Sequence, residues 1–352
     1  MNDYIFLRGL RRVDFSVFCV QDGQKTYFDP LFKCSVPYSS GQQVKRSILD
    51  RLNENLQRNP APVTFVFDVN KKKQLEESEV TSVCDPSYID QLFGGWLKLH
   101  KEGKDKGLKR RSPLSISAMR PLHPLLGGIV KENISFDRSD RPECHEVIVR
   151  DSDGKELNSA QIDELLTDSD RSLFRKWIPE NKRATGLFIY DVAIDLRRLF
   201  TVSTNQQEPE ITTETITELI NKGWTESENV FGKCLLMPEE EANLAIKALA
   251  NALIEWHISS NQARTFSLME TLAVAISDNA NTLAASIRAK LVGDYDKPKA
   301  TPIIDEHCGA NVYMTLPCAG YIQTESESAT ALNDAENKLI EMMKDFYRKL
   351  KP

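Results

Sequence analysis

The chain has 352 residues, of which 41% are hydrophobic and 27% are charged, and this is the composition of a globular protein rather than of a disordered chain. No apolar run reaches the ~20 residues that a membrane-spanning helix needs, and the first residues lack the positive region and apolar core of a secretory signal. The seven cysteines are scattered and form no CxxC pair, which predicts reduced thiols in a cytoplasmic protein without a structural zinc site. We also expect no membrane contact, no bound metal and no cofactor.

The net charge of −6 is distributed unevenly along the chain. Residues 98–120 hold eight Lys or Arg against two Asp or Glu, and the first 120 residues together carry +6. The remaining 232 residues carry −12. This split is typical of a region that faces a polyanion on an otherwise acidic body. A solvated, lysine-rich loop gives the same pattern, so charge alone leaves both interpretations open.

The N-terminal segments favour strands on either side of a helix. Residues 4–20 are rich in Phe, Val and Ile and predict a strand with an interruption near Gly9. A short strand is expected at 26–28, and a further one at 62–69.

The helix between these strands is predicted from Ser40 to about Arg58. Its apolar residues recur every four positions, at Val44, Ile48, Leu52 and Leu56. Ser40 and Gln43 have the spacing of a capping box, which places the first helical turn directly after Ser40.

The middle of the chain has mixed signals, and regular patterns return after residue 185. Between 70 and 184 we expect insertions that emerge from a compact core, with a helix at 85–100 and an acidic, loop-rich region at 132–170. The later elements are a strand at 186–202, a short helix near 213–222, a helix from Pro238 to Trp256, a strand at 266–277, and helices at 282–291 and 330–350. Two strand–helix units that frame an insertion predict an α+β, ferredoxin-like fold.

Sequence motifs of catalytic and metal sites do not occur in this chain. The five histidines have no HxxxH or HExxH spacing, and there is no Walker loop, GxGxxG or GxSxG. We therefore expect no catalytic residue and no enzymatic activity.

Three segments carry donors suited to a nucleic-acid backbone. Residues 39–46 combine serines, glutamines and Gly41 with Lys45 and Arg46 at a predicted helix start, where free N–H groups and the helix dipole favour phosphate. A capped surface helix that binds no phosphate would have the same sequence pattern. The second segment is basic, at 109–111 with Arg120, and the third, at 261–266, combines amide and guanidinium donors with Phe266. Arg beside an aromatic residue is common in RNA-binding sites and elsewhere.

The order of five segments resembles one protein family, the Cas-seven family of CRISPR backbone subunits in its DevR-like branch. The segments are RGLRRVDFSVF (8–18), SSGQQVKRSIL (39–49), GLFIYDVAIDLRRL (186–199), EEEANLAIKALANAL (239–253) and NQARTFSLMETLAVAISD (261–278). They lie within roughly the first 70 and the last 170 residues, and the middle of the chain is only loosely comparable.

The resemblance implies a fold and a set of partners. The core would resemble an RNA-recognition motif and consist of 1–69 plus 185–352, with a finger and a thumb inserted at 70–184. Copies of the chain would stack into a filament along a CRISPR RNA, with other Cascade subunits, in the cytoplasm of a prokaryote. Each copy would hold the RNA backbone without cleaving it, so that the guide can pair with target DNA.

The resemblance also implies which residues meet the nucleic acid. The RNA-binding residues would be Arg11, Arg12, Ser39, Ser40, Gly41, Gln42, Gln43, Lys45, Arg46, Lys109, Arg110, Arg111, Arg120, Gln262, Arg264 and Phe266. The thumb would carry Arg171, Arg175, Lys176, Lys182 and Arg183. Two alternatives stay open, a type III relative that cleaves target RNA and an RNA-binding protein of similar core that works alone.

Overall fold

The computed structural model describes residues 3–18, 23–98, 107–169, 171–258, 267–293 and 297–351. The chain forms two compact units, unit 1 from Met1–Gly128 and Ala184–Pro352, and unit 2 from Ile129–Arg183. The segment predicted as a single insertion, 70–184, is therefore distributed over both units, since residues 70–128 pack within unit 1. Both helices and antiparallel strands contribute, which confirms the predicted mixture of α and β structure.

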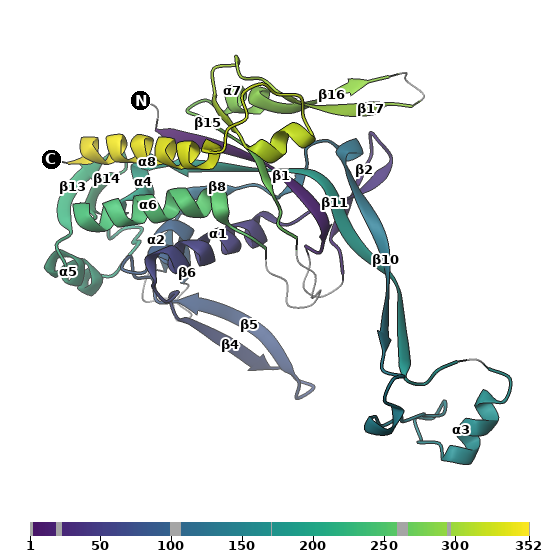
Figure 1. The fold of residues 1–352 in the computed structure, drawn as a ribbon. Helices are drawn as coiled ribbons and strands as arrows, with labels where there is room; N and C mark the ends of the chain where they lie inside the picture. The colour runs from purple at the N-terminus through teal and green to yellow at the C-terminus, as the bar shows by residue number, and fades with distance from the viewer. Residues whose placement is uncertain are drawn as a thin grey trace. The chain divides into compact units, whose positions relative to one another are not determined.

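An antiparallel sheet lies at the centre of unit 1 (Figure 1). Its middle strand is β1 (Tyr4–Ser16), which pairs with β11 (Arg175–Asp195) on one side and β15 (Thr271–Ser277) on the other. β18 (Asn311–Met314) extends the sheet beyond β15, and β8 (Leu114–Ile116) and β9 (Arg120–Pro121) pair with β11. The three long strands come from distant parts of the sequence, so the sheet brings the two ends of the chain together.

Gly9 does not interrupt β1, and the predicted break is wrong. Gly9 lies opposite Tyr190 in the β1–β11 pairing, and the ring of Tyr190 occupies the space above it. A Cβ atom at this position would lie 2.2 Å from Cε1 of Tyr190. The glycine is therefore where an aromatic ring crosses the strand rather than where the strand bends.

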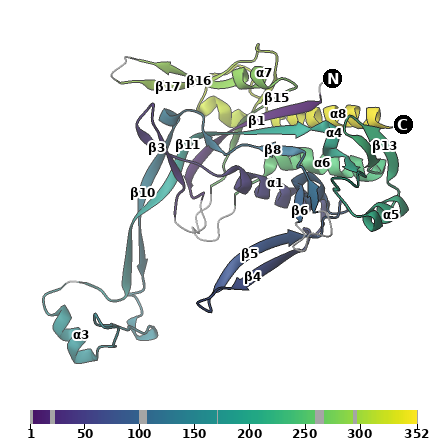
Figure 2. The same cartoon turned by 180° about the vertical axis from the view of Figure 1, so that it is seen from behind.

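Three helices cover one face of the sheet, as Figures 1 and 2 show. They are α1 (Gly41–Leu56), α6 (Glu239–Glu255) and α8 (Ala331–Leu350). The apolar positions predicted for α1 and α6 are the ones that pack: Val44, Ile48 and Leu52 are buried in α1, and Ala242, Ala245, Leu249 and Leu253 in α6. Ser40 caps α1 by accepting from the Gln43 N–H, as predicted. Gln43 itself accepts from Ser39 Oγ, so that no reciprocal capping box forms.

The other face of the sheet has a smaller core. Leu10, Ile189 and Leu272 project into it and meet Leu283 of α7 (Ala280–Ser286) and Cys318 of η3 (Leu316–Gly320). The helix predicted at 282–291 is wrong in its second half, because Ile287–Val292 is strand β16, paired with β17 (Lys299–Ile304). Pairing with a distant strand outweighs the local helical pattern there.

The remaining elements are short. Small sheets are formed by β2 (Thr26–Asp29) with β3 (Cys34–Pro37), β4 (Val63–Val69) with β5 (Leu75–Ser82), β6 (Trp96–Lys98) with β7 (Leu108–Arg110), and β12 (Thr201–Ser203) with β14 (Gly232–Leu236) and β13 (Thr225–Asn229). Single helical segments are α2 (Ile89–Gly94), η1 (Pro124–Leu126), α4 (Leu196–Leu199) and α5 (Thr213–Asn221). The strands predicted at 26–28 and 62–69 and the helices predicted near 213–222 and at 330–350 are confirmed.

Two further predictions are wrong in extent. The helix expected at 85–100 is only α2, because it ends at Gly95, whose φ of 76° is in the left-handed region that favours glycine. A Cβ on Gly95 would also lie 2.7 Å from the carbonyl oxygen of Arg110. The strand expected at 186–202 ends at Asp195, which caps the short helix α4 by accepting from the Arg197 N–H.

Unit 2 contains the distal parts of β10 (Gly127–Asp137) and β11, which are neighbours in one sheet. It also contains η2 (Pro142–Cys144) and α3 (Ser159–Leu166), whose first turn is closed by a capping box between Asn158 and Gln161. β10 runs through the start of the region predicted as loop-rich, 132–170, which is a correction to that prediction. None of the helices in the described ranges is long and apolar enough to cross a membrane.

Candidate nucleic-acid interface

The start of α1 is built against a loop of the same unit. Ser39 is buried and exchanges two backbone hydrogen bonds with Met119, of 2.9 and 3.0 Å. Gly41 lies so close to the strand end beside it that a Cβ would be 2.6 Å from the carbonyl oxygen of Ile116. Glycine is therefore needed here for close packing of the protein backbone.

Lys45 and Arg46 point in different directions. Nζ of Lys45 donates to the carbonyl oxygen of Gly94 at 2.9 Å and to Oγ of Ser112 at 2.7 Å. Arg46 is exposed and forms an ion pair of 2.8 Å with Asp50, one turn further along the helix. Of the predicted segment 39–46, the side chains that face solvent are therefore Gln42 and Arg46.

The partly buried Lys45 gives a pH dependence of stability. Burial lowers the pKa of Lys45 to about 8, below the ~10.4 of an unfolded lysine. Between these values the unfolded chain binds more protons than the folded chain, so the free energy of unfolding rises as the pH rises. We expect the stability of the natural chain, relative to Lys45→Met, to increase from about pH 8 to about pH 10.4, as measured by urea unfolding. A difference that stays constant over this range would contradict the assignment.

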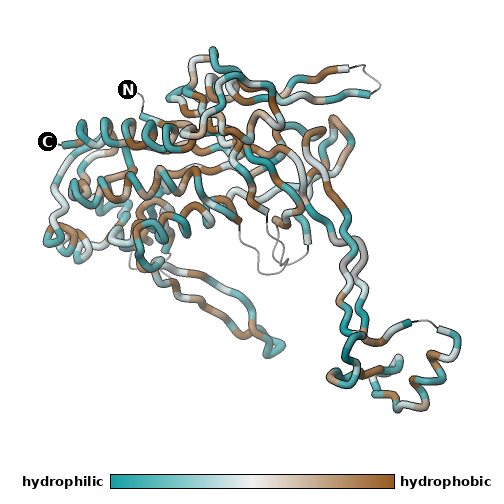
Figure 3. Tube along the Cα trace, viewed as in Figure 1, coloured by the Kyte–Doolittle hydropathy of each residue, from teal (hydrophilic) through white to brown (hydrophobic). Residues whose placement is uncertain are grey.

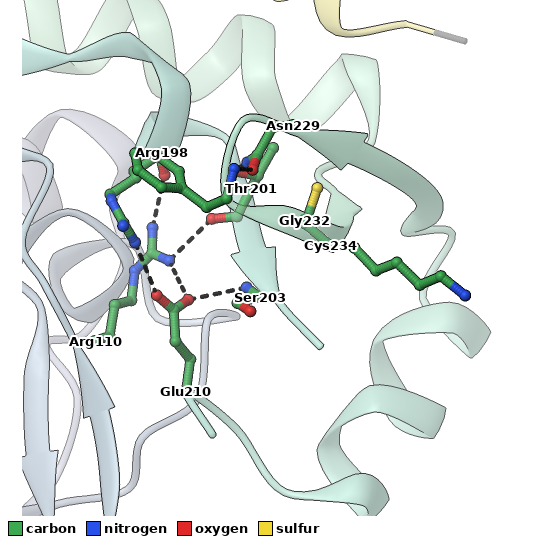
Figure 4. Close-up of a pocket in the computed structure, with 10 residues that line it drawn as sticks. Arg110, Arg198, Thr201, Ser203, Glu210, Asn229, Gly232 and Cys234 are labelled. Atoms are coloured by element: carbon green, nitrogen blue, oxygen red, sulfur yellow. Dashed lines mark hydrogen bonds and ion pairs between the residues drawn. The ribbon is translucent and has the colours of Figure 1, made fainter. Parts of the chain in front are cut away.

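The side chains of the basic segment 109–111 point alternately to solvent and to the interior at β7. Lys109 and Arg111 are exposed, and Arg110 between them is buried. Its guanidinium pairs with Glu210 at 2.8 Å and donates to the carbonyl oxygens of Thr201 and Arg198 (Figure 4). It also donates to the carbonyl oxygen of Leu92. Every nitrogen of this guanidinium has a protein acceptor, so the placement of Arg110 does not support its predicted contact with RNA.

Arg120 joins a cluster that sequence reasoning missed. Arg8 of β1 binds Asp191 of β11 through two bonds of 2.6 and 3.1 Å and donates to the carbonyl oxygen of Ile287. Arg120 lies 3.6 Å from the same carboxylate. A cavity of about 400 Å³ beside this cluster is lined by Phe6, Arg8, Ser115, Ser117 and Asp191, among others. Arg8 opens the segment 8–18, but only the strand pairing reveals its acidic partner.

Arg11 is enclosed where α6 ends. Its guanidinium lies 4.2 Å from the ring centroid of Trp256 and donates to the carbonyl oxygens of Ile254 and Trp256 at 2.6 and 2.7 Å. Its placement therefore does not support its predicted RNA contact. Arg12, next in the strand, is partly exposed, pairs with Asp14 and lies over the ring of Tyr321.

The third predicted segment lies outside the described residues, with Gln262, Arg264 and Phe266 among them. Its flanks are described, and they run beside the end of β1. Arg12 N–H donates to the Glu270 carbonyl oxygen at 2.9 Å, and Asp14 N–H donates to Ser267 Oγ at 3.3 Å. The sheet thus places the segment that begins at residue 8 next to residues 267–277.

A cavity of about 520 Å³ opens between these flanks. Its lining includes Arg11, His257, Met269, Thr315 and Leu332. Burial, and then the nearby Arg11, lower the pKa of His257 below its ordinary value. A neutral imidazole there can both donate and accept a hydrogen bond.

The predicted thumb residues lie in unit 2. Arg175 binds Asp137 at 2.7 Å, and Arg183 binds Glu132 at 3.0 Å. Arg171, Lys176 and Lys182 are exposed. Across the described parts of both units, no group of three or more His, Cys, Asp or Glu side chains is placed to hold a metal ion.

Comparison with known proteins gives structural likeness without sequence likeness. No protein-family model and no curated protein matches the chain. A chain of a "CRISPR RNA-guided surveillance complex, pre-nicking" is similar over 98% of this chain and 89% of its own, with 9% identity and a TM-score of 0.45. A chain of a "CRISPR RNA-guided surveillance complex" is similar over 95% of this chain and 99% of its own, with 11% identity and a TM-score of 0.42. Both scores lie below 0.5, so the function proposed next rests on this chain's own residues.

Proposed function

We propose that the chain is a non-catalytic subunit that binds a CRISPR RNA along its backbone, in many copies, within a type I surveillance complex. The observation that carries the proposal is the convergence of the segments that resemble the Cas-seven family. β1, β11 and β15 are neighbours in one sheet, and α1 packs on α6. Segments from opposite ends of the chain form a single structural core.

The connectivity of this core supports the proposed RNA-recognition-motif-like fold. In chain order it reads β1, α1, β8 with β9, β11, α6 and β15, and in space β8 and β9 lie beside β11, which is followed by β1 and β15. This is the strand–helix–strand–strand–helix–strand order of ferredoxin-like folds. The helices cover one face of the sheet, as the two crossover connections require.

The surface donors are suited to sequence-independent binding. Specificity would come from base pairing of the guide, so the protein needs contacts to phosphates and sugars only. Three exposed cations are Arg46 on α1, Lys109 on β7 and Arg111 directly after β7. Each gives a modest, salt-dependent contribution, and many copies along one RNA multiply it.

Arg46→Ala combined with Lys109→Ala should weaken guide binding equally for unrelated spacer sequences. The slope of log K against log salt should fall by about 0.7 per lost phosphate contact, the value for single strands. The measurement is fluorescence anisotropy of labelled guide RNAs at several salt concentrations. Arg348→Ala is the matched control, because Arg348 is an equally exposed arginine that pairs with Asp345 on its own helix. A loss confined to particular spacers would show that these residues read bases.

The absence of a catalytic role is tested separately. The assembled complex is incubated with complementary RNA and magnesium, and the products are resolved by length. The proposal expects intact target RNA. Cuts at regular intervals would favour the type III alternative.

A further inference from the structure

The cavity of about 400 Å³ beside Arg8 and Asp191 lies on the sheet face opposite the three helices. Side chains two residues apart on a strand point to the same face, so Phe6 and Arg8 share this face with Leu10, which is buried in the smaller core. The surrounding strands are mostly hydrophobic, as Figure 3 shows for β15 and for the part of β11 that pairs with β1. Phe6 and Arg8 both line the cavity, which therefore has an aromatic wall and a polar wall.

The strand register leaves open space beside the ring of Phe6. Phe6 pairs with Ala193 of β11 on one side and with Ser277 of β15 on the other. Ala193 in turn pairs with Ser115 of β8. Because these three neighbours are small, no large side chain from a paired position fills the volume next to the ring. Ser115 and Ala280 line the cavity and are exposed, so a ligand can enter it from solvent.

The ring of Phe6 is held in place by stacked neighbours. Tyr4 stacks on it, with ring centroids 5.8 Å apart and an angle of 17° between the ring planes. The guanidinium of Arg197 lies 4.9 Å from the centroid of the Tyr4 ring and donates to the Tyr4 hydroxyl at 2.7 Å. Such preorganisation lowers the entropic cost of binding. A flat ligand in the cavity would therefore extend this stack from a wall that is already fixed.

The charges around the cavity favour a neutral ring with polar edges. Arg8 and Asp191 are the two charged residues of its described lining, and they bind each other at 2.6 and 3.1 Å. A phosphate inside the cavity would meet no unpaired cation, whereas a nucleobase is uncharged and has hydrogen-bonding edges. Arg120 lies beside the cavity, 3.6 Å from Asp191, and in the described part of the chain its Nη1 has no hydrogen-bond partner. A nucleotide would supply the acceptor that this donor lacks.

We propose that the cavity binds one unpaired RNA base, which stacks on Phe6 while Arg120 contacts the attached ribose or phosphate. Stacking tolerates any sequence because every base has a π-face, so it is compatible with guides of different spacers. The volume of about 400 Å³ is within the range of small-ligand pockets. The inference rests on the proposed function, and it adds a base contact to the phosphate contacts proposed above.

Two variants change the cavity in opposite ways. Phe6→Leu removes the ring but keeps an apolar side chain, and Ala193→Leu fills the space beside the ring. Fluorescence anisotropy of the full chain compares a labelled single-stranded oligoadenylate with an abasic RNA of the same length and charge. Each variant should weaken binding of the oligoadenylate by about five- to 150-fold, the range for one stacked base, and should leave binding of the abasic RNA unchanged. Phe28→Leu, at an exposed position on β2 outside the cavity, is the control and should bind both RNAs like the natural chain.

Equal losses for the two RNAs, or no loss for either, would overturn the inference. Thermal melting verifies that each variant is folded, and Ala193→Leu tests the cavity without removing the Phe6 ring from the sheet. If the natural chain binds both RNAs with the same affinity, backbone binding stands and the base contact is wrong. If it binds neither RNA, the proposed function fails as well.

An excess of adenosine separates an RNA base from a free nucleoside as the occupant. Adenosine should lower the affinity of the natural chain for the oligoadenylate towards its affinity for the abasic RNA. If adenosine binds in a way that depends on Phe6 but leaves the affinity for both RNAs unchanged, the cavity belongs to a free nucleoside, and the inference is overturned.

Discussion

Arg110→Ala is expected to destabilise the folded chain by about 3–5 kcal/mol, the cost of breaking a buried ion pair from one side. Arg110 and Glu210 are almost fully buried. The alanine variant leaves the Glu210 carboxylate without its main cation. It also removes the hydrogen bonds that Arg110 donates to the carbonyl oxygens of Leu92, Thr201 and Arg198. Chemical unfolding followed by circular dichroism gives the free energy of unfolding of each chain.

The flanking cations are the matched controls for Arg110. Lys109 and Arg111 are exposed, and surface substitutions away from special features change stability by about 0.5 kcal/mol or less. We expect the opposite pattern in RNA binding: alanine at Lys109 or Arg111 lowers the affinity for RNA directly. Arg110→Ala lowers that affinity only because it destabilises the fold. An Arg110→Ala chain as stable as the natural one, but defective in RNA binding, would contradict the structural role.

Arg11→Ala is expected to cost about 2–4 kcal/mol, from the loss of two hydrogen bonds to buried carbonyls and of stacking on an aromatic ring. The carbonyl oxygens belong to Ile254 and Trp256, where α6 ends. Arg11 thus fixes the end of α6 to the middle strand of the sheet. Urea unfolding measures the loss, and the transition should remain cooperative.

Arg12→Ala is the control for Arg11. Arg12 is the next residue of β1, and it pairs with Asp14 at a partly exposed site. Pairs of this kind contribute about 0–1 kcal/mol. Equal effects of the two substitutions would show that the enclosure of Arg11 does not contribute to stability.

Helices with a complete apolar stripe could be predicted from the sequence. α1, α6 and α8 each repeat apolar residues at helical spacing, and tertiary packing reinforces the pattern. β5, β16 and β17 could not, because their strand character depends on a partner strand rather than on local alternation. The predicted break at Gly9 is wrong for a related reason, since the ring that covers Gly9 comes from Tyr190, far along the chain.

The sequence could predict which segments lie near the candidate site, but not which of their side chains face solvent. The segments at 8–18 and 39–49 and the described flanks of 261–266 pack in one compact unit. Within them, sequence could not separate Arg110 from Lys109 or Lys45 from Arg46. In each pair, one side chain points to the interior and its neighbour points to solvent. Which of the two points inward depends on residues from elsewhere in the fold.

The most direct test of the proposed function is to purify the chain from its own cells under native conditions, sequence any bound RNA, and measure the protein-to-RNA ratio by native mass spectrometry. We expect CRISPR RNAs with many different spacers and several copies of the chain on each RNA. A strictly monomeric, RNA-free protein would contradict the proposal.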